Sequence, residues 1–306
     1  YFQFRKSRGS CEKFHGAVVD HVSHGGVFDS VTNENTRVFK DVQSVGAELK
    51  SMNERGDVYG TEVKPQVAIV YDVENRWALD AAAGPRNKDK DEKYVETLLT
   101  HYRPFWDKGV QVDIVDMDGD ISKYKLVIAP MLYMYRAGFE KKMRKFVENG
   151  GTVILCGQSD MGGRNLHTSG EMNKLLEAMG ATVRLNDDAA SSISTNVFNP
   201  DSGLTKSLTQ EQTYTQRAGC TVNPGNGTWL VKGRDTTHGI DADADGQETG
   251  EDTVLLAGEE LPGDGKVYVS GGLFLEDSAM KEPDNIWKPV SGNQRIVEVL
   301  LKIERA

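Results

Sequence analysis

The chain has 306 residues, 38% of them hydrophobic and 27% charged, a size that allows about two domains with sizeable cores. No apolar run approaches the ~20 residues needed to cross a bilayer, which predicts a soluble protein without membrane contact. The formal net charge of −10 disfavours a nucleic-acid partner, because phosphates bind clustered Lys and Arg.

Residues 1–60 contain too few predicted elements for a core of their own. An aromatic strand opens the chain, and a glycine-containing loop and a polar stretch follow. Apolar residues then recur at three- and four-residue steps, which predicts a helix over about 35–52. One strand and one helix cannot enclose a core. We therefore expect this segment to pack on structure upstream of Tyr1, where the natural start of the chain would lie.

From residue 66 onward, strands and helices alternate, as in a mostly parallel, doubly wound α/β sheet covered on both faces. Continuous apolar runs predict the strands, and amphipathic spacing, capping and glycine stops predict the helices. The predicted strands cover 67–71, 111–115, 125–129, 152–156, 253–257 and 266–270, and the predicted helices cover about 91–107, 139–148, 168–180 and 293–303.

Residues 186–250 interrupt this alternation. They are rich in Asn, Asp, Ser, Thr and Gly, and only residues 228–231 have strand character. We expect a long irregular excursion with little helix, inside a domain that extends over residues 66–306.

The first sixteen residues combine several motifs in a fixed order. An aromatic strand precedes Arg8-Gly9-Ser10 and Glu12-Lys13-Phe14-His15-Gly16, and Thr36–Phe39 and Gly46–Leu49 come later. This order closely resembles the end of the catalytic barrel in family 42 glycoside hydrolases, which are β-galactosidases. The resemblance implies that residues 1–60 are the last β/α unit of a TIM barrel.

The same resemblance implies sugar-binding roles for three residues. Phe2 would form an apolar wall of the pocket, while Glu12 and His15 would hydrogen-bond hydroxyls of the bound galactose. These residue types suit a polyol, since carboxylate and imidazole exchange hydrogen bonds with hydroxyls and an aromatic face covers the C–H face of a pyranose. Without the resemblance, two exposed polar residues and a core Phe would be the simpler interpretation.

The catalytic carboxyl groups themselves are not expected in this chain. Retaining glycosidases need an acid and a nucleophile with carboxyl groups about 5 Å apart. In the family both are glutamates on earlier barrel strands, and neither is present here. We therefore expect this chain alone to be inactive, and the full polypeptide to hydrolyse terminal β-galactosides with retention.

Residues 66 to about 185 resemble the domain that follows the barrel in this family. The matching stretches are Val67–Asp72, Glu74–Leu79 and Leu126–Tyr133. That domain is similar in fold to class I glutamine amidotransferases, a flavodoxin-like arrangement, and it serves in trimer formation. The resemblance implies a homo-oligomer, specifically a trimer. The alternative is a non-catalytic amidotransferase-like module for ligand binding or interaction.

Cys156 offers a second class of function, because amidotransferase-like enzymes carry a catalytic cysteine on a tight turn after a strand. Such a cysteine needs a base to form thiolate, and His167 and His238 are the downstream imidazoles. The turn lacks the Gly-x-Cys-x-Gly pattern. A small buried thiol at the end of a strand is the better interpretation.

The acidic stretch near residue 241 has the spacing of a calcium loop. Asp241, Asp243 and Asp245 stand at ligand positions, and Asp252 stands at the twelfth. However, Glu248 occupies the usually apolar eighth position, and no apolar-periodic helix flanks the loop. A solvated acidic loop is favoured over calcium, and no cofactor is predicted.

The cysteines and tryptophans bear on location and assembly. Three widely spaced cysteines without CxxC spacing indicate neither a disulfide framework nor a zinc site, and favour the cytoplasm over secretion. Trp77, Trp106 and Trp287 are interpreted as packing or interface residues. An interface is favoured for Trp77, because it follows the end of the first buried strand.

Overall fold

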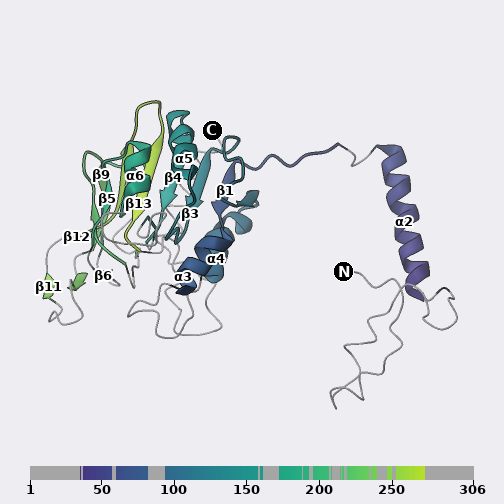
Figure 1. Cartoon of the computed structure of the whole chain (residues 1–306), viewed down its shortest axis with the longest axis horizontal. Helices are drawn as coiled ribbons and strands as arrows, with labels where there is room; N and C mark the ends of the chain where they lie inside the picture. Colours follow the sequence, from purple (N-terminus) through teal and green to yellow (C-terminus); the bar gives the residue numbers. More distant parts are fainter. Residues whose placement is uncertain are drawn as a thin grey trace, which may run out of the picture. The chain divides into compact units, whose positions relative to one another are not determined.

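The computed structural model divides the chain into two compact units, residues 1–63 and 64–306, and each unit is described by itself (Figure 1). The structure describes residues 35, 37–56, 60–81, 94–157, 159–160, 172–187, 189–192, 196–206, 208, 214, 216, 219–233, 236–239, 247–249 and 253–272.

The described helix of the first unit is α2 (Arg37–Arg55), where the apolar spacing predicted one. None of its residues is buried, and Val42, Val45 and Leu49 are all more than half exposed. The strand predicted for the first residues lies outside the described part of the chain.

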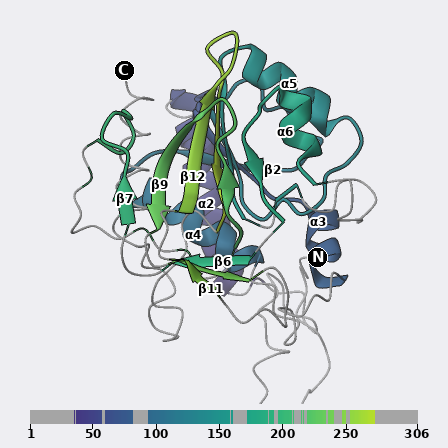
Figure 2. The ribbon, with the colours of Figure 1, turned by 90° about the vertical axis from the view of Figure 1, so that its left-hand side faces the viewer.

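An eight-stranded sheet organises the second unit, in the order β2-β1-β3-β4-β13-β12-β9-β7 (Figures 1 and 2). The first five strands in this order pair in parallel, and the last three add antiparallel neighbours. The α/β fold with a mostly parallel core is therefore confirmed. The strands are β1 (Val67–Val70), β2 (Val112–Val115), β3 (Leu126–Ala129), β4 (Thr152–Leu155), β7 (Asn196–Phe198), β9 (Thr228–Gly233), β12 (Thr253–Glu260) and β13 (Lys266–Ser270).

Helices cover both faces of this sheet. On one face, α4 (Tyr94–Asp107) packs Leu98 and Phe105 against the strand cores. On the other face, α5 (Phe139–Glu148) and α6 (Lys174–Met179) lie side by side and bury Phe139 and Met143, among others (Figure 2). The strands β1 and β3 are buried at every position, as their continuous apolar runs predicted.

Three features of this unit differ from the sequence-based expectation. A short helix, α3 (Val73–Ala81), follows β1 and was not predicted. The helix predicted to start at the capping box of residues 168–171 is described only from Lys174, after Asn173 in the left-handed region. The excursion contains more strands than predicted: β6 (Ala189–Ser192), β8 (Val222–Asn223), β10 (Thr236–Gly239) and β11 (Gln247–Thr249) accompany β7 and β9, and β5 (Arg184–Leu185) directly precedes it.

The strand order locates a crevice at the carboxyl ends of β1 and β3. The chain places β2 on one side of β1 and β3 on the other side. Helices that leave β1 and β3 therefore diverge to opposite faces, and a crevice opens at the carboxyl ends of these strands. Asp72, the α3 helix and the segment after β3 all meet there.

Candidate functional site

The residues predicted to contact sugar or calcium lie outside the described residues. These are Phe2, Glu12 and His15, and the possible calcium ligands Asp241, Asp243 and Asp245. Within the described part of the chain, no group of three or more His, Cys, Asp or Glu side chains could hold a metal ion. No described helix is long and apolar enough to span a membrane.

Cys156 directly follows β4 as a fully buried thiol paired with an imidazole. Its Sγ lies 3.3 Å from Nε2 of His101, while Nδ1 of His101 lies 2.7 Å from the carbonyl oxygen of Thr97. Because a carbonyl oxygen can only accept, we assign the ring hydrogen to Nδ1, which leaves Nε2 to accept from the thiol. Burial lowers the pKa of His101 to about 4, partly offset by the Thr97 hydrogen bond.

This pair does not make a reactive thiolate. The imidazole is neutral at pH 7, and both side chains are sealed from solvent. A nucleophilic cysteine needs a thiolate that a substrate can reach. The structure therefore supports the interpretation of Cys156 as a buried structural thiol. The sequence did not indicate His101 as the partner of Cys156. Of the two imidazoles that it offered as a base, His167 and the side chain of His238 lie outside the described residues.

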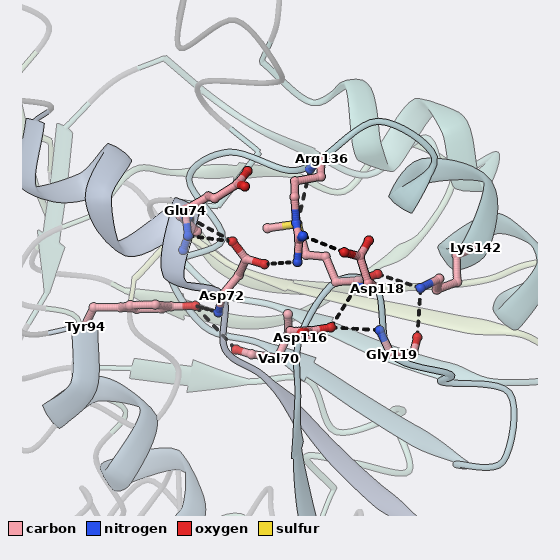
Figure 3. A network of polar contacts seen from close by, with 11 residues as sticks. Val70, Asp72, Glu74, Tyr94, Asp116, Asp118, Gly119, Arg136 and Lys142 are labelled. Carbon is pink, nitrogen blue, oxygen red and sulfur yellow. Dashed lines mark hydrogen bonds and ion pairs between the residues drawn. The ribbon is translucent and has the colours of Figure 1, made fainter. Parts of the chain in front are cut away.

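Asp72 connects three elements at the crevice (Figure 3). It directly follows β1, and its Oδ1 accepts the backbone N–H groups of Glu74 (2.9 Å) and Asn75 (3.0 Å), which caps the first turn of α3. Its Oδ2 accepts from Nη2 of Arg136 at 2.5 Å. The Asp72 side chain is 2% exposed and that of Arg136 is 26% exposed. One carboxylate thus starts a helix and anchors the segment after β3.

Neighbouring polar groups complete this arrangement. The Asn75 side chain donates to the carbonyl oxygen of Met131 (2.9 Å) and accepts from the N–H of Met134 (3.0 Å), which ties α3 to the chain after β3. The hydroxyl of Tyr94 accepts from the N–H of Asp72 at 3.3 Å. Burial raises the pKa of Tyr94 to about 12, so this hydroxyl stays protonated.

The loop after β2 lies between Arg136 and α5 (Figure 3). Nη1 of Arg136 donates to Oδ2 of Asp118 at 2.6 Å. Oδ1 of Asp116 accepts from the N–H groups of Asp118 and Gly119, both at 2.8 Å, and holds the loop in a turn. Lys142 of α5 donates to the carbonyl oxygens of Met117 and Gly119. Ion pairs and hydrogen bonds therefore fix the loop relative to α5.

A pocket of about 470 Å³ opens beside this network, between α3 and the exposed edge of β2. It is lined by Tyr71, Asp72, Val73, Glu74, Trp77, Ile114, Val115, Asp116 and Arg136. Trp77 is 65% exposed, Val73 is 47% exposed and Ile114 is 46% exposed. An apolar surface with carboxylates around it is suited to binding a partner, since solvent-exposed apolar patches of this kind mark interaction sites.

Sequence reasoning selected Trp77 but missed Asp72, Asn75 and Arg136. The signal for Asp72 was present, because an Asp that directly follows a buried strand and precedes a helix is a typical N-cap. Arg136 carries no such local signal, since its partner Asp72 lies 64 positions away.

Two families match the chain, in the order of their domains. Residues 1–52 match glycoside hydrolase family 42, described as "Beta-galactosidase". Residues 65–222 match the family described as "Beta-galactosidase trimerisation domain". Among curated proteins, β-galactosidase Pbg of Clostridium perfringens is 54% identical over 154 residues, which cover 50% of this chain and 20% of that relative. β-Galactosidase BglY of Alicyclobacillus acidocaldarius is 50% identical over 155 residues, 51% of this chain and 20% of the relative. The matched part of the chain thus spans about a fifth of these relatives' length.

The chain is also similar to solved structures of β-galactosidases. A catalytic mutant of a family 42 β-galactosidase from G. stearothermophilus superimposes with a TM-score of 0.64 and 27% identity, and covers 100% of this chain and 37% of that chain. The β-galactosidase from Rahnella sp. R3 has a TM-score of 0.63 and 27% identity, with coverages of 100% and 39%.

Proposed function

The chain belongs to the glycoside hydrolase family 42 β-galactosidases, and we propose that the polypeptide of which it is the C-terminal portion hydrolyses terminal β-D-galactosides with retention. The observation that carries this proposal is the order of the two family matches, residues 1–52 followed by residues 65–222. The two catalytic glutamates belong to earlier barrel strands, so the chain alone is inactive. Its contribution is one side of the sugar pocket and the assembly domain.

The activity is tested with two nitrophenyl glycosides. The full-length polypeptide is expected to hydrolyse nitrophenyl β-galactoside faster than the α-arabinoside, and the 306-residue chain is expected to hydrolyse neither. A full-length polypeptide without β-galactosidase activity, or an active 306-residue chain, contradicts the proposal.

The proposed sugar contacts predict a specific loss of activity. Glu12→Gln keeps the shape of the side chain but removes the charge that strengthens its hydrogen bonds to galactose hydroxyls. A hydrogen bond to a charged group contributes about 1.5–3 kcal/mol, so kcat/KM of the full-length enzyme is expected to fall roughly 10- to 100-fold. Glu148→Gln, on the exposed surface of α5, is the matched control and leaves kcat/KM unchanged. Equal kinetics for both variants would remove Glu12 from the pocket.

The exposed face of α2 supports the barrel assignment of the first unit. Val42, Val45 and Leu49 lie on one stripe and are exposed in this chain. In a (β/α)8 barrel, such a stripe packs on the barrel strands and the adjacent helices. We assign the preceding barrel units of the full polypeptide as its cover.

The second unit serves to assemble the enzyme, and we propose that the assembly is a homotrimer. Support comes from the trimerisation-domain match at residues 65–222 and from the exposed Trp77, Val73 and Ile114 on the same domain. The mass of the full-length polypeptide by light scattering is expected to be three times that of the monomer. A monomeric or dimeric mass contradicts this.

A cytoplasmic location completes the proposal. Cys156 and Cys220 are both buried, and neither forms a disulfide in the described part of the chain. Free thiols persist in reducing compartments, whereas secreted proteins usually pair theirs. Localisation of the full-length protein by cell fractionation tests this, and recovery from the medium would overturn it.

A further inference from the structure

The edge of the sheet at β2 carries a patch that contacts among the described residues leave exposed. We define the β2-edge patch as Val73 and Trp77 of α3, Ile114 of β2, and the carboxylates of Glu74 and Asp116 at the border of the same pocket. Its three apolar side chains are 46–65% exposed. A Trp exposed beside two other exposed apolar side chains is typical of an interface anchor, since aromatic residues are enriched at interfaces and dominate their hot spots.

The patch has an unbalanced negative charge. Of its neighbouring cations, Arg136 is already bound by Asp72 and Asp118, and Arg76 of α3 interacts with Tyr71, Asp80 and Glu96. Among the described residues, neither Glu74 nor Asp116 forms an ion pair. The carboxylates that line the same pocket as Trp77 therefore favour a partner surface with basic side chains, because complementary charges orient the two surfaces and like charges oppose their association.

The same domain presents such a basic surface on α5. Lys141, Arg144 and Lys145 are exposed on its outer side, while Met143 faces the core. Arg144 forms an ion pair with Glu148, whereas Lys141 and Lys145 form none among the described residues. Lys145 borders a pocket that Asp118 and Asp120 also line. The loop of residues 116–120 lies between this surface and the β2-edge patch, because Asp116 borders the patch and Lys142 binds the carbonyl oxygens of Met117 and Gly119.

Three-fold symmetry requires two different surfaces of this kind. In a closed ring of three, each contact joins one surface of a subunit to another surface of the next, unlike the self-complementary contact of a two-fold dimer. In a ring of three, each subunit contacts both neighbours near the symmetry axis. Its two contact surfaces therefore lie on either side of the part of the subunit that faces this axis. The β2-edge patch and the α5 lysines flank the 116–120 loop in this way.

We propose that the β2-edge patch binds a second copy of this chain, with Trp77 packed against the neighbour and Glu74 and Asp116 facing Lys141 and Lys145 of its α5. This inference rests on the proposed trimer and adds to it which surfaces meet. It assigns Trp77 as the anchor and the charges as the determinants of orientation.

The first experiment compares two equally exposed tryptophans in the full-length polypeptide. Trp77→Ala is expected to raise the dissociation constant of the trimer at least about thirtyfold, as for an interface hot spot. Trp106→Ala is the matched control. Trp106 is 64% exposed, but it belongs to α4 and does not line the pocket of the β2-edge patch. Sedimentation across a concentration series measures both. An unchanged trimer for Trp77→Ala, or dissociation by Trp106→Ala alone, overturns the proposal.

The second experiment reverses the charges. Glu74→Lys with Asp116→Asn reverses the patch, and Asn keeps an oxygen that can hold the turn at Asp118 and Gly119. Lys141→Glu with Lys145→Glu reverses α5. Each reversal alone is expected to weaken the trimer at least tenfold, and the two together are expected to restore most of the lost affinity. Additive weakening would show that these surfaces do not meet.

The outcomes separate this inference from the proposed trimer. A monomeric wild-type polypeptide overturns both. A wild-type trimer that withstands Trp77→Ala and both charge reversals overturns only the pairing of these surfaces. If Trp77→Ala lowers the melting temperature of the full-length polypeptide and leaves its mass trimeric, the patch is covered by the barrel of the same subunit and the inference is wrong.

Discussion

Replacing Asp72 with Ala is expected to lower the free energy of unfolding of the α/β domain by about 4 kcal/mol. Loss of the helix cap contributes about 1 kcal/mol, since two N–H groups of α3 lose their acceptor. Loss of the buried partner of Arg136 contributes about 3 kcal/mol, the lower end for such pairs, because Arg136 is partly exposed and keeps Asp118. Urea unfolding measures the total, and hydrogen exchange of the α3 amides reports the local part.

A double-mutant cycle separates the two contributions of Asp72. Asp72→Asn keeps a good capping residue but removes the charge. Arg136→Met is expected to cost about 3 kcal/mol beside Asp72, which would then be buried with no counter-charge from Arg136, and about 1 kcal/mol or less beside Asn. Equal costs in the two backgrounds would show that the ion pair does not stabilise the domain.

The parallel half of the sheet could be predicted because each of its buried strands is a short continuous apolar run. The helix α5 was equally clear, since its four buried residues recur at helical spacing against a basic outer face. Residues such as Val67–Val70 and Phe139 carry this information locally. No long-range contact is needed to recognise them.

The helix α3 escaped prediction because its burial pattern is inverted. Its buried side includes the polar Asn75, whereas Trp77, its largest apolar side chain, is exposed. Hydrophobic periodicity therefore gives no clear stripe. The buried position of Asn75 depends on Met131 and Met134, which are distant in sequence.

The other strands of residues 186–250 could not be predicted from the sequence pattern for a different reason. Most of them are two to four residues long and rich in Ser, Thr or Asn, and they form through pairing with distant partners. The strand β7, for example, pairs with β9 across more than thirty residues. Strand propensity depends strongly on such neighbours. Likewise, neither the Asp72–Arg136 pair nor the Cys156–His101 pair could be assigned before the fold brought the partners together.

Acid is expected to destabilise the α/β domain through His101, by about 3 kcal/mol between pH 6.5 and pH 4. Burial lowers the pKa of this imidazole to about 4 in the folded domain, whereas an unfolded chain binds the proton near pH 6.5. Stability from this group is therefore complete above pH 6.5 and is lost as the pH falls toward 4. Asp160 acts in the opposite direction, because burial raises its pKa to about 7 and protonation then favours the folded state. The wild type must therefore be compared with His101→Gln, which removes the imidazole titration; its loss of the Cys156 and Thr97 hydrogen bonds changes stability equally at all these pH values. The difference between their unfolding free energies is expected to shrink by about 3 kcal/mol from pH 7.5 to pH 4, and parallel pH curves would show that His101 is not held neutral by burial.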